Sequence, residues 1–307
     1  MAIVLQESLR GLFYAPYYAA FALDAYDQEG VEVRFAEAPG FGNAPTGLYD
    51  GSTDAAWGGP MRVNQLYGER ADCDVVCFGE AVTRDPFMLI GREPRPDFAL
   101  TDLVQARIAT VSEVPTPWLC LQHDLRLAGV DPVSLDRVAD RGMADNMAAL
   151  RAGTVDVIQL FQPLAEELIE KGSGHVWYAA ATRGPCSYTT FYARRPVLEA
   201  KRDEFRLLVR ALYRTQKWLY AQPAEALADV VQSYFPAVPR PRLVAALARY
   251  KTLGVWSETP ILPRDGYERL KDGLVSGGFC SGVDYEVAVD NSLADAAVAD
   301  DPPALTQ

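Results

Sequence analysis

The stretch Leu150-Arg-Ala-Gly-Thr-Val-Asp-Val-Ile-Gln-Leu-Phe-Gln-Pro163 decides the fold. It has the pattern of a last helical turn, a glycine stop, and a short apolar strand that opens into a proline-containing loop. Gly153 stands just after the helix end, where the backbone commonly takes the left-handed αL conformation. Glycine adopts this conformation without a Cβ clash. Val155, Val157, Ile158 and Leu160 form a run that is too short for a helix and favours a buried strand.

The same pattern occurs about a hundred residues earlier, in Leu48-Tyr-Asp-Gly-Ser-Thr-Asp-Ala-Ala-Trp57. In both stretches a glycine follows leucine by three positions and an aspartate follows glycine by three. The same leucine–glycine–aspartate spacing between a helix end and a strand, found twice, predicts two lobes of similar structure.

Strand and helix patterns alternate along most of the chain, which favours an α/β fold with mostly parallel sheets and flanking helices. Ile3–Leu5 begins the series, and Arg92–Phe98 has the prolines and charges of a surface connection, after which the alternation restarts. We therefore expect lobe I to comprise residues 1–90 plus 190–307 and lobe II, inserted into it, residues 91–189. Two crossover segments, near 84–98 and 184–196, then form a hinge. Residues 290–307, rich in Ala, Asp and Pro, are expected to be a flexible tail.

Composition excludes several classes of function. A net charge of -12 argues against a nucleic-acid or anionic-membrane partner, because both demand a basic face. No apolar segment approaches the roughly 20 residues of a membrane span, so direct membrane insertion is not expected. No signal peptide is visible after Met1, and we expect the protein to be periplasmic if such a segment was removed and cytoplasmic otherwise.

Residues that carry common enzyme chemistry are sparse. No lysine precedes Lys171, so residues 1–170 cannot form a Schiff base. The two histidines, His123 and His175, lack neighbours at metal-ligand spacing, and the five cysteines have no regular spacing. We therefore expect no metal site, no cofactor and no catalytic constellation.

The loops that follow the predicted strands carry the candidate binding residues. In open parallel sheets ligands bind at the carboxyl ends of strands, where helix N-termini offer free N–H groups. Arginines there can pair with an anion through a bidentate fork. Glu80 and Glu113 could be cleft carboxylates, but contacts at the surface or between lobes are the favoured roles. The predicted ligand-binding residues are Arg10, Phe13, Tyr14, Phe41, Asn43, Trp57, Gly58, Arg62, Ser112, Thr116, Trp118, Phe161, Gln162 and Tyr188.

The two copies of the leucine–glycine–aspartate pattern are expected to frame opposite walls of one cleft. Trp57 follows the first copy, and Phe161 and Gln162 follow the second. The sequence thus predicts that these side chains face each other across a ligand.

Several segments resemble the substrate-binding proteins for nitrate, sulfonate, taurine and thiamine-pyrimidine uptake. The resemblance covers roughly residues 3–290 and says little about the ligand. The segments that carry it are Leu12–Ala20, Gln28–Val33, Ala148–Asp156, Gln162–Glu166, Ala211–Tyr220 and Gln222–Glu225.

The resemblance implies a type II periplasmic-binding-protein fold, with two α/β lobes that close on a ligand. It implies the solute-binding protein of an ABC importer, with the importer permease as partner and a small organic anion (sulfonate or carboxylate) or a planar heterocycle as ligand. The alternatives are a cytoplasmic enzyme on the same scaffold, of a decarboxylase or thiamine-pyrimidine-precursor type, and a small-molecule sensor outside transport. The pyrimidine-forming branch of the family uses a cleft lysine and a His/Cys-rich motif, whereas this sequence has no lysine before Lys171 and no such His/Cys cluster.

Overall fold

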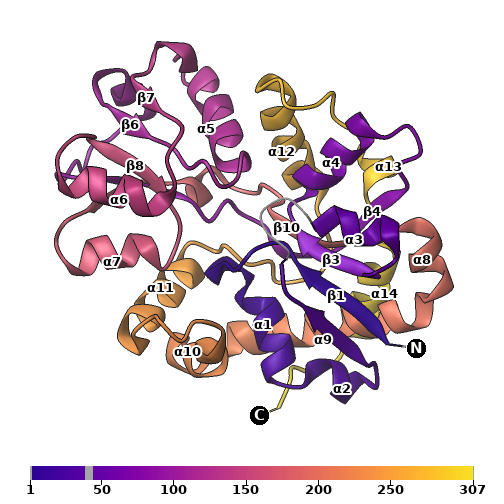
Figure 1. Ribbon diagram of the computed structural model, residues 1–307. Helices are drawn as coiled ribbons and strands as arrows, with labels where there is room; N and C mark the ends of the chain where they lie inside the picture. Colours follow the sequence, from indigo (N-terminus) through magenta and orange to yellow (C-terminus); the bar gives the residue numbers. More distant parts are fainter. Residues whose placement is uncertain (1, 39–43, 307) are drawn as a thin grey trace.

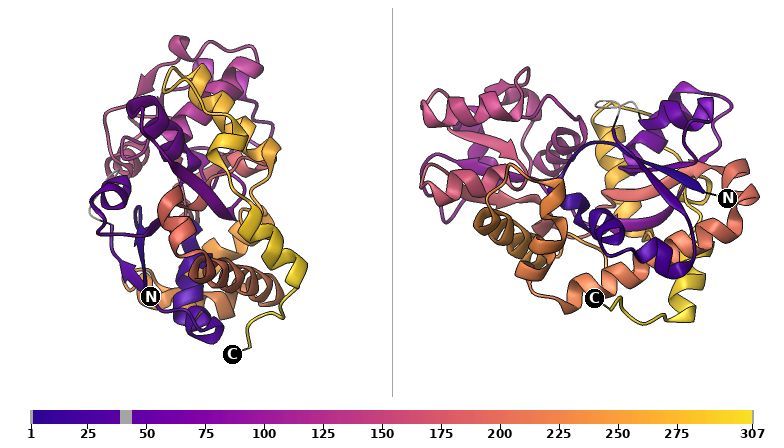
Figure 2. Two further views of the ribbon diagram at one scale, coloured as in Figure 1. Left: turned by 90° about the vertical axis from the view of Figure 1, so that its right-hand side faces the viewer. Right: turned by 60° about the horizontal axis from the view of Figure 1, so that its bottom comes forward.

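The computed structural model describes residues 2–38 and 44–306, and within them the strands form two sheets of five strands each (Figure 1). One sheet has the order β2-β1-β3-β10-β4 and the other β7-β6-β8-β5-β9. Helices pack around both sheets, and the right-hand view of Figure 2 keeps the second lobe, in magenta, to one side of the first. The two-lobed α/β fold predicted from the sequence is confirmed.

Lobe I contains the first sheet and the helices of both ends of the chain. Its strands are β1 (Ile3–Glu7), β2 (Val33–Ala36), β3 (Ala55–Gly58), β4 (Val75–Val82) and β10 (Thr189–Arg194). Its helices are η1 (Leu12–Tyr14), α1 (Ala15–Ala22), α2 (Ala25–Glu29), α3 (Ala44–Asp50), α4 (Pro60–Glu69), α8 (Arg195–Ala200), α9 (Arg202–Ala221), α10 (Ala224–Val231), η5 (Gln232–Tyr234), α11 (Arg240–Thr252), α12 (Arg264–Ser276), α13 (Tyr285–Ala288) and α14 (Ser292–Asp300).

Lobe II is one continuous piece of chain, residues 88–183. Its strands are β5 (Met88–Gly91), β6 (Ile108–Ala109), β7 (Arg137–Val138), β8 (Val157–Leu160) and β9 (His175–Ala179). Its helices are η2 (Leu100–Gln105), α5 (Thr116–Leu127), η3 (Pro132–Ser134), α6 (Met143–Arg151), α7 (Leu164–Glu170) and η4 (Ala180–Arg183).

The repeated leucine–glycine–aspartate pattern has the same structure in both lobes. Gly51 and Gly153 follow α3 and α6 with φ of 78° and 69°, the left-handed region that favours glycine. The aspartate three residues later precedes β3 in one lobe and β8 in the other. Asp54 Oδ2 accepts a hydrogen bond of 2.8 Å from the N–H of Val4, and Asp156 Oδ2 accepts one of 2.8 Å from the N–H of Arg107. Each carboxylate thus ties its own strand to the start of the neighbouring parallel strand.

The sheets are less parallel than the sequence pattern suggested. β1 is parallel to β2 and β3, but β10 is antiparallel to β3 and β4. In lobe II, β6 is parallel to β7 and β8, whereas β5 is antiparallel to β8 and β9. β5 and β10 are the first strands after the chain crosses between lobes, so they enter their sheets from the opposite end.

The boundary of lobe II also differs from the expected 91–189. β5, which we assigned to lobe I, pairs with β8 and β9 and therefore belongs to lobe II. The chain crosses from lobe I to lobe II in residues 83–87, directly after β4, and returns in 184–188. Arg92–Phe98 is then a surface connection inside lobe II, not the segment that joins the lobes.

Residues 290–306 are not a flexible tail, in contrast to our expectation. They contain α14, which packs along α9 through the buried side chains of Leu293, Ala294 and Ala297. Asp300 pairs with Arg210 of α9 at 3.0 Å. The composition suggested a tail, but it also contains this apolar stripe and an acidic end that matches the basic face of α9.

A cluster of four charged side chains, three of them buried, lies where the chain crosses between lobes. The guanidinium of Arg183 is 3.2 Å from the carboxylate of Asp85 in the first crossover and 2.8 Å from that of Asp124 in α5. Asp124 also pairs at 3.2 Å with Arg269 of α12, in lobe I. Burial raises the pKa of Asp85 to about 6, and the positive charge of Arg183 opposes that rise. Two positive and two negative side chains thus link both lobes at the hinge.

Replacing Asp156 with Ala should lower the free energy of unfolding by about 1–2 kcal/mol, since it removes a hydrogen bond from a charged acceptor to the Arg107 N–H. Urea unfolding would measure the loss. Asp97→Ala, an exposed carboxylate in the same lobe, is the control and should change stability by less than about 0.5 kcal/mol. Equal effects of the two substitutions would contradict the role given to Asp156.

Candidate functional site

A small pocket lies between the lobes, with walls from both of them. Its volume is ≈ 60 Å³, room for roughly four to six water molecules. Lobe I and lobe II contribute one wall each, and the two crossover segments contribute Phe87 and Tyr188 between them. The remaining lining residues are Ser8, Leu9, Phe13, Tyr14, Gly59, Met61 and Arg62 from lobe I and Glu113, Val114, Thr116, Met143 and Phe161 from lobe II.

Four aromatic rings form a continuous cluster across the pocket. Phe13 of lobe I meets Phe161 of lobe II edge to face, with ring centroids 5.3 Å apart. Phe161 also contacts Phe87 at 5.2 Å, and Phe13 lies 6.3 Å from Tyr188. Edge-to-face pairs at these distances are favourable beyond their buried area. The pocket therefore has an aromatic wall to which both lobes and both crossovers contribute.

The polar part of the pocket comes from two helix N-termini and Arg62. α4 begins beside the lining residues Gly59 and Met61, and α5 begins beside Val114 and Thr116. Pro60 and Pro117 have no N–H, and the N–H of Arg62 donates to the Gly59 carbonyl, so the helix dipole and the few N–H groups that remain free at these two ends are what favours an anion. Arg62 donates to Gln65 at 2.6 Å, and no ion pair of Arg62 occurs within residues 2–38 and 44–306. Its charge lowers the pKa of the Tyr14 phenol, although burial raises that pKa overall.

Hydrogen bonds behind the lining fix the loop after β1. Ser8 Oγ donates to the carbonyl of Trp57, and the Nε1–H of Trp256 donates to the carbonyl of Phe13 at 2.8 Å. Gly58 permits this arrangement, because a Cβ there would lie 2.4 Å from Ser8 Oγ. Gly58 therefore supports the pocket from behind, while its neighbour Gly59 lines it.

Six of the predicted ligand-binding residues meet in this pocket. Five of them come from loops or helix starts that follow strands, which is the rule that selected them, and Tyr188 lies in a crossover. They are Phe13, Tyr14, Arg62, Thr116, Phe161 and Tyr188.

The predicted pairing of Trp57 with Phe161 and Gln162 across a ligand is wrong. Trp57 is fully buried and stacks on Tyr17 at 4.8 Å, behind the pocket wall. It lies at the end of a strand whose residues are all buried, so its side chain points into the packing against α1. Phe13 occupies the position opposite Phe161 instead.

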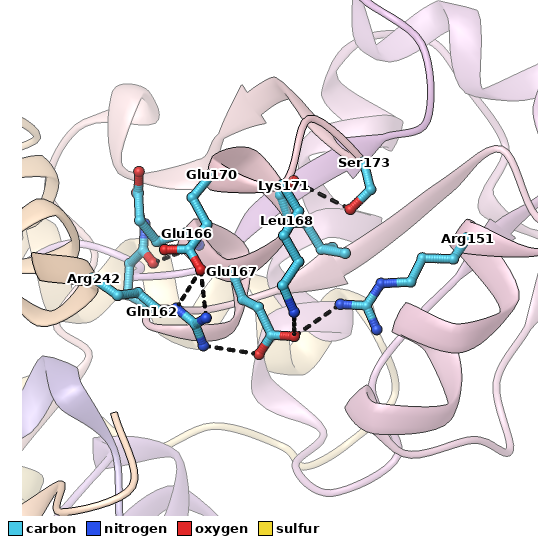
Figure 3. Close-up of polar contacts among 9 residues, drawn as sticks. All are labelled: Arg151, Gln162, Glu166, Glu167, Leu168, Glu170, Lys171, Ser173 and Arg242. Carbon is cyan, nitrogen blue, oxygen red and sulfur yellow. Dashed lines mark hydrogen bonds and ion pairs between the residues drawn. The ribbon is translucent and has the colours of Figure 1, made fainter. Parts of the chain in front are cut away.

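The side chain of Gln162 is hydrogen-bonded within lobe II. It is fully buried, its Oε1 accepts the N–H of Glu166 at 3.0 Å, and its Nε2 donates to the Glu166 carboxylate at 3.1 Å. Figure 3 shows this pair beside the ion pairs of Glu167 with Arg151 and with Arg242 of α11. Because Arg242 comes from the C-terminal half of the chain, this polar group joins α7 to α11.

Three further predicted residues, Arg10, Ser112 and Trp118, do not line the pocket. Arg10 is held by Glu7, to which its Nε and Nη2 both donate, and it is oriented over the rings of Tyr18 and Tyr234. Ser112 is exposed, and Trp118 lies 3.8 Å beneath the guanidinium of Arg137. Phe41 and Asn43 lie outside the described residues.

Eight lining residues were missed by the sequence reasoning. Six of them lie in the loops that supplied the predicted residues, so position in the loop was a usable signal: Ser8, Leu9, Gly59, Met61, Glu113 and Val114. Glu113 was considered but given another role, and nothing in the sequence distinguished Met143 from a core residue. Phe87 was assigned to a strand.

Glu80, the second carboxylate considered, is buried inside lobe I. It lies in β4 at 1% exposure and does not line the pocket. Its backbone carbonyl accepts hydrogen bonds from Gln216 and Ser257. Burial raises the pKa of its carboxyl to about 8, so the proton is retained at neutral pH.

Within residues 2–38 and 44–306, no three His, Cys, Asp or Glu side chains are grouped so as to hold a metal ion. Within the same residues, no helix is both long and apolar enough to cross a bilayer.

Comparison with known proteins places the chain. YtlA of Bacillus subtilis (strain 168) is 24% identical over 296 residues, covering 95% of this chain and 89% of that protein. Its name describes it, by inference, as a binding protein. The periplasmic aliphatic sulphonate-binding protein SsuA of Escherichia coli has a TM-score of 0.77 at 16% identity, over 94% and 92% of the two chains. The desulfurization enzyme DSZB has a TM-score of 0.71 at 14% identity, over 98% and 99%.

The two five-stranded sheets and the pocket between the lobes define a fold of the periplasmic-binding-protein type. Both the topology and the solved structures that the chain resembles support this fold. The chain belongs to the NMT1/THI5-like family, whose model matches residues 13–226. The family resemblance predicted from the sequence is thus confirmed.

Replacing Glu80 with Gln should flatten the dependence of stability on pH. Because the folded pKa is about 8 against an ordinary 4.5, the protonated fold is favoured in acid, and stability falls by about 1.4 kcal/mol per pH unit as pH rises from about 4.5 to about 8. The neutral amide lacks this dependence. Urea unfolding at pH 5, 6, 7 and 8 would show the gain of Glu80→Gln over wild type growing with pH, while the exposed Glu258→Gln should follow wild type. Parallel curves for wild type and Glu80→Gln would refute the assignment.

Proposed function

We propose that this protein is the solute-binding protein of an ABC importer and captures a small organic anion with an apolar or aromatic body. The observation that carries the proposal is the composition of the interlobe pocket. Its wall is aromatic, and its polar part includes Arg62 and the N-termini of α4 and α5. These groups match a sulfonate or carboxylate attached to an apolar group. The sulphonate named for the Escherichia coli structure has this chemistry.

Capture by lobe closure follows from the way the pocket is divided. Lobe I provides Arg62, lobe II provides Thr116 and Phe161, and the narrow crossovers at 83–87 and 184–188 lie between. A ligand that contacts both walls binds the closed form better than an open one, and this difference in affinity drives closure. The importer permease is the partner that would recognise the closed form. As part of the same proposal, the protein works outside the cytoplasm, which fractionation of the native host would test.

An enzyme on the same scaffold is the second possibility, because DSZB shares the fold. Among the described residues that line the pocket there is no Cys, His or Lys. No side chain there can therefore act as a thiolate nucleophile, an imidazole base or a Schiff-base amine. Binding is therefore better supported than turnover. A panel of sulfonates, aromatic carboxylates and pyrimidines, scored both for thermal stabilisation and for product formation, separates the two. Stabilisation without product supports capture, and product formation overturns it.

Replacing Arg62 with Ala should weaken binding of an organic sulfonate about 10- to 100-fold, because a charge-assisted hydrogen bond is worth about 1.5–3 kcal/mol. Isothermal titration calorimetry would measure the change. Arg70→Ala is the matched control, since Arg70 follows the opposite end of the same helix and pairs with exposed Asp72. Unchanged affinity in Arg62→Ala would remove Arg62 from the site.

A further inference from the structure

One carboxylate in the pocket is only half satisfied. Glu113 precedes α5 in lobe II and lines the pocket. Its Oε1 accepts a hydrogen bond of 2.7 Å from the N–H of Met143, the first residue of α6. Its Oε2 is buried and has no hydrogen-bond partner in the described residues. A buried carboxylate oxygen without a donor is costly, so such an atom marks a place where a donor is expected.

No described side chain donates a hydrogen bond to this Oε2 atom. Within residues 2–38 and 44–306, neither Glu113 nor Arg62 forms an ion pair, although both line the pocket. The Oε1 atom already uses the free N–H at the start of α6, which leaves the N-termini of α4 and α5 for an anion. Tyr188, whose hydroxyl is also buried without a partner, lines the same pocket. The pocket thus contains a positive group on one wall and a negative group on the other.

We infer that Glu113 selects ligands that carry an N–H donor in addition to the anionic group. The inference rests on the proposed function. The anionic group lies toward Arg62 and the start of α4 on lobe I, and the ammonium, amino or ring N–H group donates to Glu113 Oε2 on lobe II. A ligand of this kind joins the two lobes through two charged contacts, whereas an anion without a donor leaves Oε2 unsatisfied and faces its negative charge.

The test compares ligands in which a methyl group replaces the amino group, and with it the N–H donor and any positive charge. Propane-1-sulfonate and 4-methylbenzenesulfonate replace the amino group of 2-aminoethanesulfonate and 4-aminobenzenesulfonate with a methyl group of similar size. Titration calorimetry on the full chain should show the better amino compound binding about tenfold or more tightly than its methyl counterpart, as expected for a hydrogen bond to a charged group.

The variants assign that preference to one side chain. Glu113→Gln retains an oxygen that can cap α6 but removes the charge, and it should abolish the preference for the amino compounds without loss of the folded state by circular dichroism. Asp145→Asn is the matched control, because Asp145 is an exposed carboxylate in the first turn of the same helix α6. It should keep the wild-type preference.

The possible outcomes separate this inference from the proposed function. Equal affinity for amino and methyl compounds, or a preference that survives in Glu113→Gln, overturns the role of Glu113 while capture of sulfonates stands. Failure of all four sulfonates to bind the folded wild-type protein overturns the proposed capture of organic sulfonates, and with it this inference.

Discussion

Each lobe depends on one aspartate carboxylate that accepts a backbone N–H from the neighbouring strand. Asp54 accepts the N–H of Val4, and Asp156 accepts that of Arg107, in both cases at 2.8 Å. A helix must end, turn at a left-handed glycine and place the aspartate at the start of a strand for this bond to form. The parallel pairs β1–β3 and β6–β8 then begin in register. Because loops at the far ends of these strands carry the pocket residues, the position of each pocket wall follows from this constraint.

The position of one pocket wall relative to the other depends on how the two lobes are joined. β5 and β10 enter their sheets antiparallel, and the crossovers that precede them lie side by side, where the N–H of Cys186 donates to the Thr83 carbonyl at 2.8 Å. Arg183 pairs there with Asp85 and Asp124, and breaking a buried pair by removing one partner is strongly destabilising. Helix pairs α5–α12 and α7–α11 flank the crossovers. The lobes are thus joined along a line, which suits rotation about that line better than separation.

Much of this fold could be predicted from local patterns, and the limits are physical. The glycine positions and strand order within a β-α unit are local, so the repeat at Gly51 and Gly153 was visible in the sequence. The direction in which a strand enters a sheet depends on distant pairing, which is why β5 was assigned to the wrong lobe. The same holds for the site. Loop position identified Arg62 and Phe161, but side-chain direction decides between a pocket and a core, and Trp57 points into the core. The orphan oxygen of Glu113 is a property of three-dimensional contacts alone.

The position of β10 in the first sheet affects the order in which the two lobes can fold during synthesis. β10 lies between β3 and β4, yet it is made more than a hundred residues after them. During synthesis β4 therefore has no sheet partner on that side until the whole of lobe II has left the ribosome. Lobe II, being continuous in sequence, can complete its own sheet first, since domains generally fold as units in the order of synthesis. Lobe I waits for β10 and α9, so the second lobe in the architecture is the first that can be finished.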